Sequence, residues 1–284
     1  MPRSIGRMGE GEKEPLEVRH CPNGKANTMA AGLPVEYKDH FTRQSPQYSR
    51  YRPSYPLELF EYLASLVHPR RLAWDCATGG GQASLGLVDH FDRVIATDAS
   101  TNQIAHAARH PGIIYAVSPA EESGIRTGSV DLVVVAQALH WFDFERFYRE
   151  VRRVLRTSGA IAVWCYGLMR ITPDVDAVID GFYNHTVGPY WPPERRYIEG
   201  AYRSIPFPFE EPVHTPQFSM RAAWDLDHLI GYLGTWSSVQ EYRKKEGNDP
   251  IGLVAESLLK AWGPPSSPRE VRWPLHLRVG VVAR

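Results

Sequence analysis

The chain has 284 residues, 43% of them hydrophobic, and its 32 lysines and arginines are balanced by 32 acidic side chains. This size suits one large α/β domain, and the zero net charge leaves no basic surplus for a nucleic acid partner. No apolar run approaches the length that crosses a bilayer, and three cysteines cannot all pair, so the composition predicts a reduced, cytoplasmic protein without a membrane partner.

The N-terminal segment differs from the rest of the chain. Residues 1–32 are rich in Gly, Glu, Lys and Arg, show almost no apolar periodicity and lack the hydrophobic core of a secretory signal. We therefore expect a disordered tail over residues 1–36, followed by a single domain over residues 37–284.

A glycine-dense turn follows the first predicted strand of this domain. The apolar run LAWDC at residues 72–76 leads into ATGGGQ at residues 77–82. Glycine lacks a Cβ and adopts positive φ, so a ligand can approach the backbone of such a turn closely. A helix from about Ala83 would present free N–H groups at its N-terminus to that ligand. The turn therefore predicts a nucleotide-like cofactor.

The spacing of the glycines distinguishes two kinds of cofactor site. The dinucleotide pattern G-x-G-x-x-G fits Gly79 and Gly81 but meets Ser84 at its third position, which argues against a nicotinamide-dependent oxidoreductase. A second strand from Arg93 ends in Asp98, whose carboxylate could accept hydrogen bonds from a ribose diol. Dehydrogenases place an acid similarly, so this second strand leaves both kinds of site open.

Strands and helices alternate along the rest of the domain, which predicts a parallel sheet covered on both faces. The expected elements are a helix over 103–108, a strand over 112–117, a buried strand from 129, a helix over 144–155 and a strand over 160–164. An antiparallel pair is expected at about 213–220 and 271–283, with Pro274 near an edge or a bulge.

Three segments carry a family resemblance. The pattern Asp75-x-Ala77-x-Gly79-x-Gly81 resembles the first motif of class I S-adenosylmethionine-dependent methyltransferases, with Ala77 where that family usually has glycine. The segment SVDLVVVAQALHWFD at residues 129–143 and the leading segment at 41–56 resemble the branch that contains trans-aconitate methyltransferases. The resemblance runs from about Tyr37 to Arg284. It implies a Rossmann-like α/β fold with a seven-stranded, mostly parallel sheet, an antiparallel terminal hairpin and a helical cap.

The resemblance also implies a site for S-adenosylmethionine, with S-adenosylhomocysteine as the product. The residues expected to bind the cofactor are Arg52, Asp75, Ala77, Thr78, Gly79, Gly81, Gln82, Asp98, Ala99, Gln103, Ala120, Glu121 and Gln137. Asp98 is expected at the ribose hydroxyls, and Asp75 at the glycine loop and the cofactor's amino group. For Gln137 a surface-loop role stays open, and for Arg52 a local salt bridge or a substrate carboxylate.

Two aromatic-rich segments, at about 167–207 and 221–268, interrupt the core elements. We expect them to form the cap over the carboxyl ends of the strands, where open α/β sheets bind ligands, with most of their aromatic side chains packing the cap itself. The residues expected to line a substrate pocket are Tyr48, Trp141, Tyr183, Trp191 and Trp236.

Methyl transfer from a sulfonium needs alignment and exclusion of water more than covalent help, and a general base only where the acceptor must lose a proton. His140 is the candidate base, with an orienting hydrogen bond as its other possible role. His106 and His110 are spaced i, i+4 on the expected helix, but no third ligand is near and only Asp143 follows the fourth strand, so no metal is expected.

The sequence therefore predicts a methyltransferase that acts on a small-molecule acceptor, at an oxygen of a carboxylate or hydroxyl, as a monomer or dimer. Two alternatives stay open. One is a non-catalytic protein that binds a cofactor or a partner on the same fold, which the alanine at position 77 permits. The other is the nicotinamide-dependent oxidoreductase.

Overall fold

A computed structural model of the chain describes residues 51–281. The tail expected over residues 1–36 and the pocket residue Tyr48 lie outside the described residues. Seven strands form one sheet in the order β3-β2-β1-β4-β5-β7-β6. They are β1 (Leu72–Cys76), β2 (Arg93–Asp98), β3 (Ile113–Val117), β4 (Val130–Ala136), β5 (Leu155–Tyr166), β6 (Phe218–Trp224) and β7 (Arg269–Val281). The first five run parallel and β7 runs antiparallel to both β5 and β6, which confirms the expected fold class.

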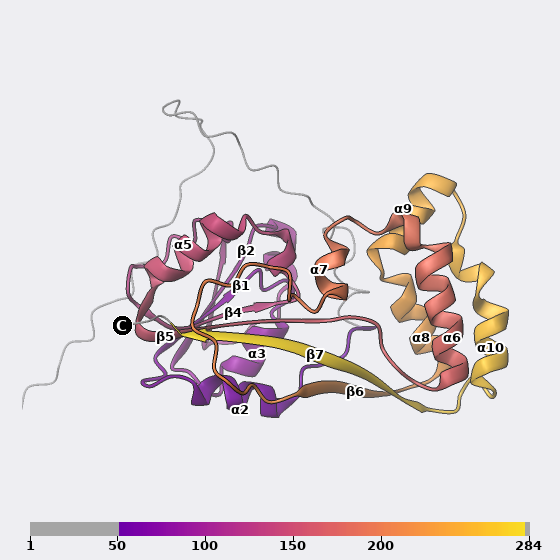
Figure 1. Cartoon of the computed structure of the whole chain (residues 1–284), viewed down its shortest axis with the longest axis horizontal. Coiled ribbons are helices and arrows are strands. Elements are labelled where there is room, and N and C mark those ends of the chain that lie inside the picture. The colour runs from indigo at the N-terminus through magenta and orange to yellow at the C-terminus, as the bar shows by residue number, and fades with distance from the viewer. Residues whose placement is uncertain (1–50, 282–284) are drawn as a thin grey trace, which may run out of the picture.

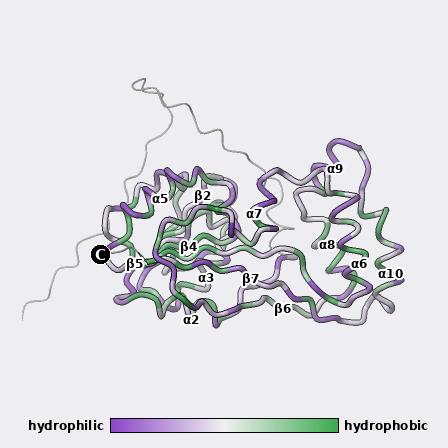
Figure 2. Tube along the Cα trace, in the orientation of Figure 1, coloured by the Kyte–Doolittle hydropathy of each residue, from purple (hydrophilic) through white to green (hydrophobic). Residues whose placement is uncertain are grey.

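The central strands are buried on both faces, which explains their continuous apolar sequences. In β4, Leu132 and Val134 join one hydrophobic cluster, whereas Val133 and Val135 join the cluster on the opposite face. Asp131 is the one charged side chain in this strand, and its carboxylate accepts the backbone N–H of residue 72 at 2.9 Å. Figure 2 shows the hydrophobic colour concentrated along these inner strands.

Helices cover the parallel part of the sheet, and a second group of helices lies beyond the end at which β5 leads out (Figure 1). The helices of the sheet region are α2 (Leu57–Ser65), α3 (Gln82–Leu87), α4 (Thr101–His106), the 3-10 turn η1 (Leu139–Trp141) and α5 (Phe144–Val154). The second group, here called the cap, comprises α6 (Pro173–Gly181), α8 (Leu226–Gly234), α9 (Ser237–Glu246) and α10 (Ala255–Trp262). The short helix α7 (Arg195–Glu199) lies between the sheet and the cap. No helix of residues 51–281 is long and apolar enough to cross a membrane.

Several sequence expectations about element bounds were wrong. The strand expected from Val213 begins at Phe218 and continues to Trp224, because prolines at 212 and 216 deprive the preceding stretch of backbone donors. β6 thus overlaps the start of the second cap segment, which the sequence places at about 221–268. The fifth strand begins at Leu155 rather than 160 and is irregular near Ser158, where φ is 69°.

The helix expected over 103–108 ends at His106, so His106 and His110 do not share a helix face. The N–H of Ala108 is bonded to the carbonyl of Gly80 at 3.1 Å, which takes the chain out of the helix. His106 Nδ1 lies 2.8 Å from its own helix's Asn102 carbonyl. Within residues 51–281, no three His, Cys, Asp or Glu side chains are grouped so that they could hold a metal ion.

Pro274 lies at a lapse in strand pairing, as expected for a strand residue without an N–H. Pairing of β7 with β5 begins at Leu275, and the next contact on that side is the isolated bridge between Arg272 and Arg170. Pro274 itself pairs only with Ser219 of β6. The proline therefore removes no hydrogen bond from the β5–β7 ladder.

Candidate active site

The loop between β1 and α3 bends through three residues in the left-handed region. Ala77, Gly79 and Gly81 have φ of 56°, 55° and 87°, and Gly81 is the residue before the first turn of α3. Glycine adopts this conformation without steric cost, but at Ala77 the Cβ makes it unfavourable by roughly 1–2 kcal/mol. The departure from the family pattern noted in the sequence therefore falls at a strained backbone position.

Tyr115 of β3 packs over the end of this loop. A Cβ built on Gly81 would lie 2.4 Å from the Tyr115 hydroxyl oxygen, so no larger residue fits while Tyr115 stays in place. The hydroxyl donates a hydrogen bond to the Ala108 carbonyl at 2.6 Å, which fixes the ring there. Sequence reasoning did not find Tyr115, because it follows the loop by more than thirty residues and carries no motif of its own.

Asp75 is fully buried at the end of β1, and half of its carboxylate is satisfied by the loop. Its Oδ2 accepts hydrogen bonds from the hydroxyls of Thr78 and Ser84, both at 2.6 Å. Ser84 stands where the G-x-G-x-x-G pattern has its third glycine, and its hydroxyl is one of the two that hold Asp75. Burial raises the pKa of Asp75 to about 6 although these hydroxyl bonds lower it. Its Oδ1 is buried and has no hydrogen-bond partner among residues 51–281, which is unusual for a native polar atom and fits a donor group on a bound ligand.

Asp98 ties the glycine loop to β2. Its Oδ2 accepts the N–H of Gly79 at 2.9 Å, and its Oδ1 accepts the N–H of Ser100 at 2.8 Å. A carboxylate oxygen can accept more than one hydrogen bond, and a carboxylate at the end of this strand suits the hydroxyl groups of a ligand. Ala99 is half-buried beside it, and the N–H of Gln103 is bonded to the Ser100 hydroxyl at the start of α4.

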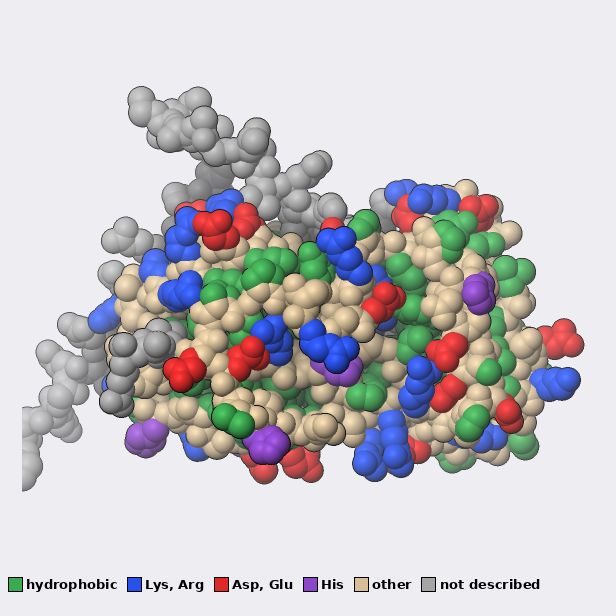
Figure 3. All heavy atoms as spheres, in the orientation of Figure 1, with side chains coloured by type: hydrophobic (Ala, Val, Ile, Leu, Met, Phe, Trp, Pro, Cys, Tyr) green, Lys and Arg blue, Asp and Glu red, His purple; other side chains and the backbone are tan. Residues whose placement is uncertain are grey.

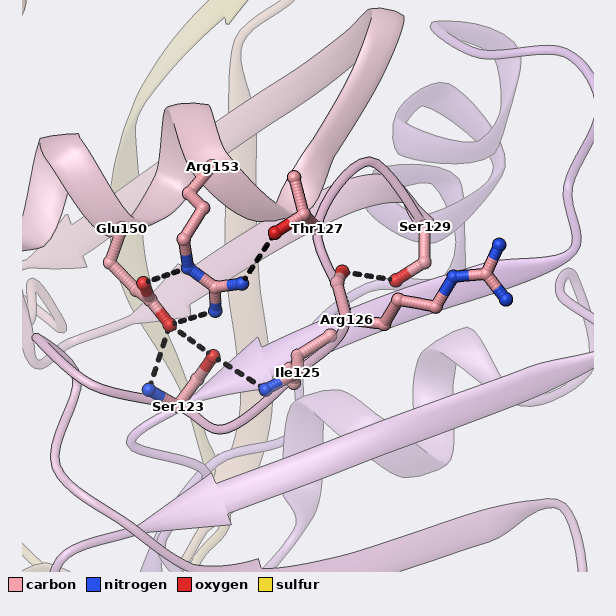
Figure 4. A network of polar contacts seen from close by, with 7 residues as sticks. All are labelled: Ser123, Ile125, Arg126, Thr127, Ser129, Glu150 and Arg153. Carbon is pink, nitrogen blue, oxygen red and sulfur yellow. Dashed lines mark hydrogen bonds and ion pairs between the residues drawn. The ribbon is translucent and has the colours of Figure 1, made fainter. Parts of the chain in front are cut away.

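The loop after β3 carries Ala120 and Glu121 and is anchored to α5. Ala120 is buried, and Glu121 accepts the N–H of Asp143 at 3.0 Å. Glu150 of α5 accepts two bonds from Ser123, from its N–H at 2.8 Å and from its hydroxyl at 2.5 Å (Figure 4).

Arg153, one helical turn further along α5, completes this anchor. It donates to both oxygens of Glu150, each at 2.7 Å (Figure 4). Burial raises the pKa of Glu150, but the bonds from Arg153 and Ser123 outweigh it and hold the pKa below its usual range. The carboxylate is therefore charged at neutral pH. Sequence reasoning missed this network because its members lie 27 residues apart.

Gln137, Gln82 and Arg52 are all engaged by protein groups. The side-chain amide of Gln137 exchanges two hydrogen bonds with the backbone of Tyr166, at 2.9 and 2.8 Å, and so joins the ends of β4 and β5. Gln82 donates to the Pro53 carbonyl at 2.7 Å. Arg52 donates to the Tyr166 hydroxyl at 3.0 Å, and its guanidinium lies 5.1 Å from the Tyr232 ring centre.

His140 in η1 is buried and neutral. Its Nδ1 lies 2.8 Å from the hydroxyl oxygen of Tyr202, a fully buried residue with φ of 59° that sequence reasoning did not find. Burial, aided by the positive charge of Arg195, lowers the pKa of His140 to about 3. A group with so low a pKa takes up protons poorly, so His140 is a weak general base and a good orienting residue.

A cavity lies between the strand ends and the cap. Gln137, His140, Trp141 and Tyr166 form its strand side, and the facing side is formed by Trp191 and Arg195, before and at the start of α7, and by Tyr232 and Trp236 of the cap region. The structure therefore brings Trp141, Trp191 and Trp236 to one cavity. Tyr183 packs against the last two, with ring centres 5.0 Å from Trp191 and 5.7 Å from Trp236, and lines a second, adjoining cavity.

Comparisons with known proteins agree with this arrangement. Residues 74–163 match the family model of a methyltransferase domain. A Dictyostelium discoideum protein described as a methyltransferase is 37% identical over 83% of this chain and 90% of its own length. A Saccharomyces cerevisiae protein described as an S-adenosylmethionine-dependent methyltransferase is 33% identical over 43% of this chain and 45% of its own length.

One solved structure is similar over nearly its whole length. It is a protein from Anaeromyxobacter dehalogenans described as a type II methyltransferase, which is 46% identical and has a TM-score of 0.76. The match covers 81% of this chain and 97% of that one. It therefore spans most of the sheet and the cap together.

Proposed function

The chain belongs to the class I S-adenosylmethionine-dependent methyltransferases, and on that basis we propose that it methylates an oxygen of a small-molecule acceptor, a carboxylate or hydroxyl, in the cavity under the cap. The family requires S-adenosylmethionine, which supplies a methyl group already activated on a sulfonium. The protein's own part is to bind, orient and exclude water.

The residues along the carboxyl ends of β1 and β2 fit this cofactor. The buried Oδ1 of Asp75, which has no partner among residues 51–281, suits a donor group, and the carboxylate of Asp98 suits hydroxyls. The left-handed glycines leave backbone without side chains at the start of α3. The loop with Ala120, held by Glu150, borders the same edge of the sheet. We assign these groups to holding the cofactor.

The single observation that carries the acceptor proposal is the neutral state of His140. Its pKa of about 3 leaves the cavity without a strong base at that position, so an acceptor that must lose a proton gains little there. A carboxylate is already ionised and needs no base. We therefore rank a carboxylate oxygen above a hydroxyl, and assign His140 to orienting the acceptor through a hydrogen bond.

The proposal is tested by transfer of a labelled methyl group to a panel of organic acids, phenols and amines, with base-labile methyl esters expected as products. Transfer only to amine nitrogen would contradict it. Binding of S-adenosylhomocysteine without turnover on any acceptor would favour the non-catalytic alternative. A preference for NAD over S-adenosylhomocysteine in calorimetry would favour the oxidoreductase.

A further inference from the structure

Arg195 lines the cavity, and Tyr183 and Trp191 hold its side chain there. Its Nε donates to the Tyr183 hydroxyl at 2.7 Å, and its guanidinium lies 4.4 Å from the Trp191 ring centre. Its two terminal nitrogens form no hydrogen bond or ion pair with any residue between 51 and 281. These two nitrogens form an edge that can bind a carboxylate through two parallel hydrogen bonds.

The orientation of Arg195 is fixed without neutralising it. Tyr183 accepts from Arg195 Nε and donates its own proton to Glu199 at 2.6 Å. Glu199 forms no ion pair with Arg195 within the described residues. The two side chains are linked only through hydrogen bonds to the Tyr183 hydroxyl. This relay and the ring of Trp191 hold the guanidinium while both terminal nitrogens stay available.

Arg195 stands where two cavities meet. The cavity beside His140 and a second cavity of about 310 Å³ share Gly167, Leu168, Arg195 and Ile198 in their walls. Arg195 is the first residue of α7, the short helix that lies between the sheet and the cap (Figure 1). An acceptor held at Arg195 could therefore place one part in the cavity beside His140, facing the strand ends, and the rest of the molecule in the second cavity.

The other arginines of the two cavities already have partners. Arg52 is bonded to Tyr166, and Arg170 forms an ion pair with Asp180 at 2.9 Å. The field of Arg195 reaches the inner cavity, because it contributes to the lowered pKa of His140. Arg195 forms no ion pair within residues 51–281, and a single positive charge matches one carboxylate better than a phosphomonoester, which carries a charge of about −2.

We propose that Arg195 determines acceptor specificity by binding an anchoring carboxylate, and that the acceptor is an organic acid with a second group, a carboxylate or hydroxyl, that is methylated. The anchor is not the reacting group, because a carboxylate bound through both oxygens to a guanidinium is a weakened nucleophile. Trp191 and Trp236 favour a planar, unsaturated or aromatic acid. This inference rests on the methyltransferase function proposed above.

The test measures binding to the full chain saturated with S-adenosylhomocysteine, by calorimetry and tryptophan fluorescence. The probes are 4-hydroxybenzoate, 3-hydroxycinnamate and muconate, each compared with its neutral carboxamide. In the parent, the preferred acid is expected to bind about tenfold or more tightly than its amide, the size of one charge-assisted pair. Arg195→Gln should reduce this preference to about threefold or less, and Arg195→Lys should restore only part of it.

Arg196→Gln is the matched control, because Arg196 is the exposed neighbour on the same helix and contacts Tyr197 instead of the cavity. It should keep the parent's preference. Tyr183→Phe breaks the relay, and it should give an intermediate preference without a change in S-adenosylhomocysteine affinity. For any probe that is methylated, Arg195→Gln should raise KM by about tenfold and change kcat little.

Equal binding of every acid and its amide in the parent would overturn the proposal, and so would a preference that survives Arg195→Gln. Failure of the parent to bind S-adenosylhomocysteine would instead overturn the proposed function. Preference of the parent for phenyl phosphate over all the carboxylates would assign Arg195 to a phosphate and refute the carboxylate anchor.

Discussion

Replacing Gly81 with alanine tests the packing of Tyr115 over the glycine loop. The new Cβ would carry a φ of 87° and lie 2.4 Å from the Tyr115 hydroxyl oxygen. The left-handed backbone costs about 1–2 kcal/mol for a residue with a Cβ. Moving the ring away sacrifices its bond to the Ala108 carbonyl, about 1 kcal/mol more. We expect Gly81→Ala to lower the free energy of unfolding by about 2–3 kcal/mol.

A double-mutant cycle separates the two contributions. Tyr115→Phe removes the hydroxyl, and the nearest ring atoms then lie 3.4 and 3.5 Å from the new Cβ, which is ordinary contact. In that background Gly81→Ala should cost only the backbone strain, so the cycle should give a coupling of about 1 kcal/mol. Urea unfolding of the four proteins measures it.

Gly124→Ala is the matched control, because Gly124 has φ of 70° but no atom within 4 Å of its would-be Cβ. It should cost strain alone, and equally in the presence and absence of Tyr115→Phe. An equal cost of Gly81→Ala in both backgrounds would refute the packing argument. Weakened S-adenosylhomocysteine binding by Gly81→Ala would add support for the loop as a ligand cradle.

Three further predictions concern the rest of the site. Asp98→Ala should weaken S-adenosylhomocysteine binding by calorimetry at least about tenfold, because it removes the loop's anchor and the proposed hydroxyl acceptor; unchanged affinity would place the cofactor elsewhere. Glu150→Ala should lower the free energy of unfolding in urea by about 1–3 kcal/mol, because Ser123 and Arg153 lose their hydrogen-bond partner, and a smaller loss would mean that the network is dispensable. His140→Gln should leave S-adenosylhomocysteine affinity unchanged and should reduce the acid-side loss of stability: the unfolded chain protonates this histidine below about pH 6.5 whereas burial holds the folded pKa at about 3, so the parent loses stability as pH falls through that window. Parallel stability curves for parent and variant between about pH 7 and pH 4 would contradict the buried, neutral histidine.

The sheet could be predicted from sequence because its signals are local. In β4, the residues that pack into the hydrophobic clusters on the two faces of the sheet are all apolar, which is a clear strand signal in the sequence. The acid Asp98 marks the end of β2. The antiparallel pair was placed correctly in kind, but the start of β6 was wrong, because strand propensity at Val213 did not weigh the prolines on either side.

The site could be predicted only as far as its motifs reached. The loop residues Asp75 and Asp98 follow from spacing, and the structure brings them to one edge of the sheet. Tyr202 contacts His140 across 62 positions, so no local pattern reveals it. Arg195 resembles any surface arginine in the sequence, and only the absence of a described ion partner distinguishes it.

The long strand β7 has a mechanical consequence. Residues from Leu275 onward pair with β5 in the sheet, whereas the residues before it pair with β6, which leads into the cap (Figure 1). The sheet and the cap are therefore joined by one continuous strand. The surface view in Figure 3 shows the two as neighbouring lobes with mixed charges. A movement of the cap away from the sheet would have to bend strand β7, because no flexible loop replaces it at this connection. Pro274 lies where the two parts of this strand meet, because it pairs with Ser219 of β6 but with no residue of β5.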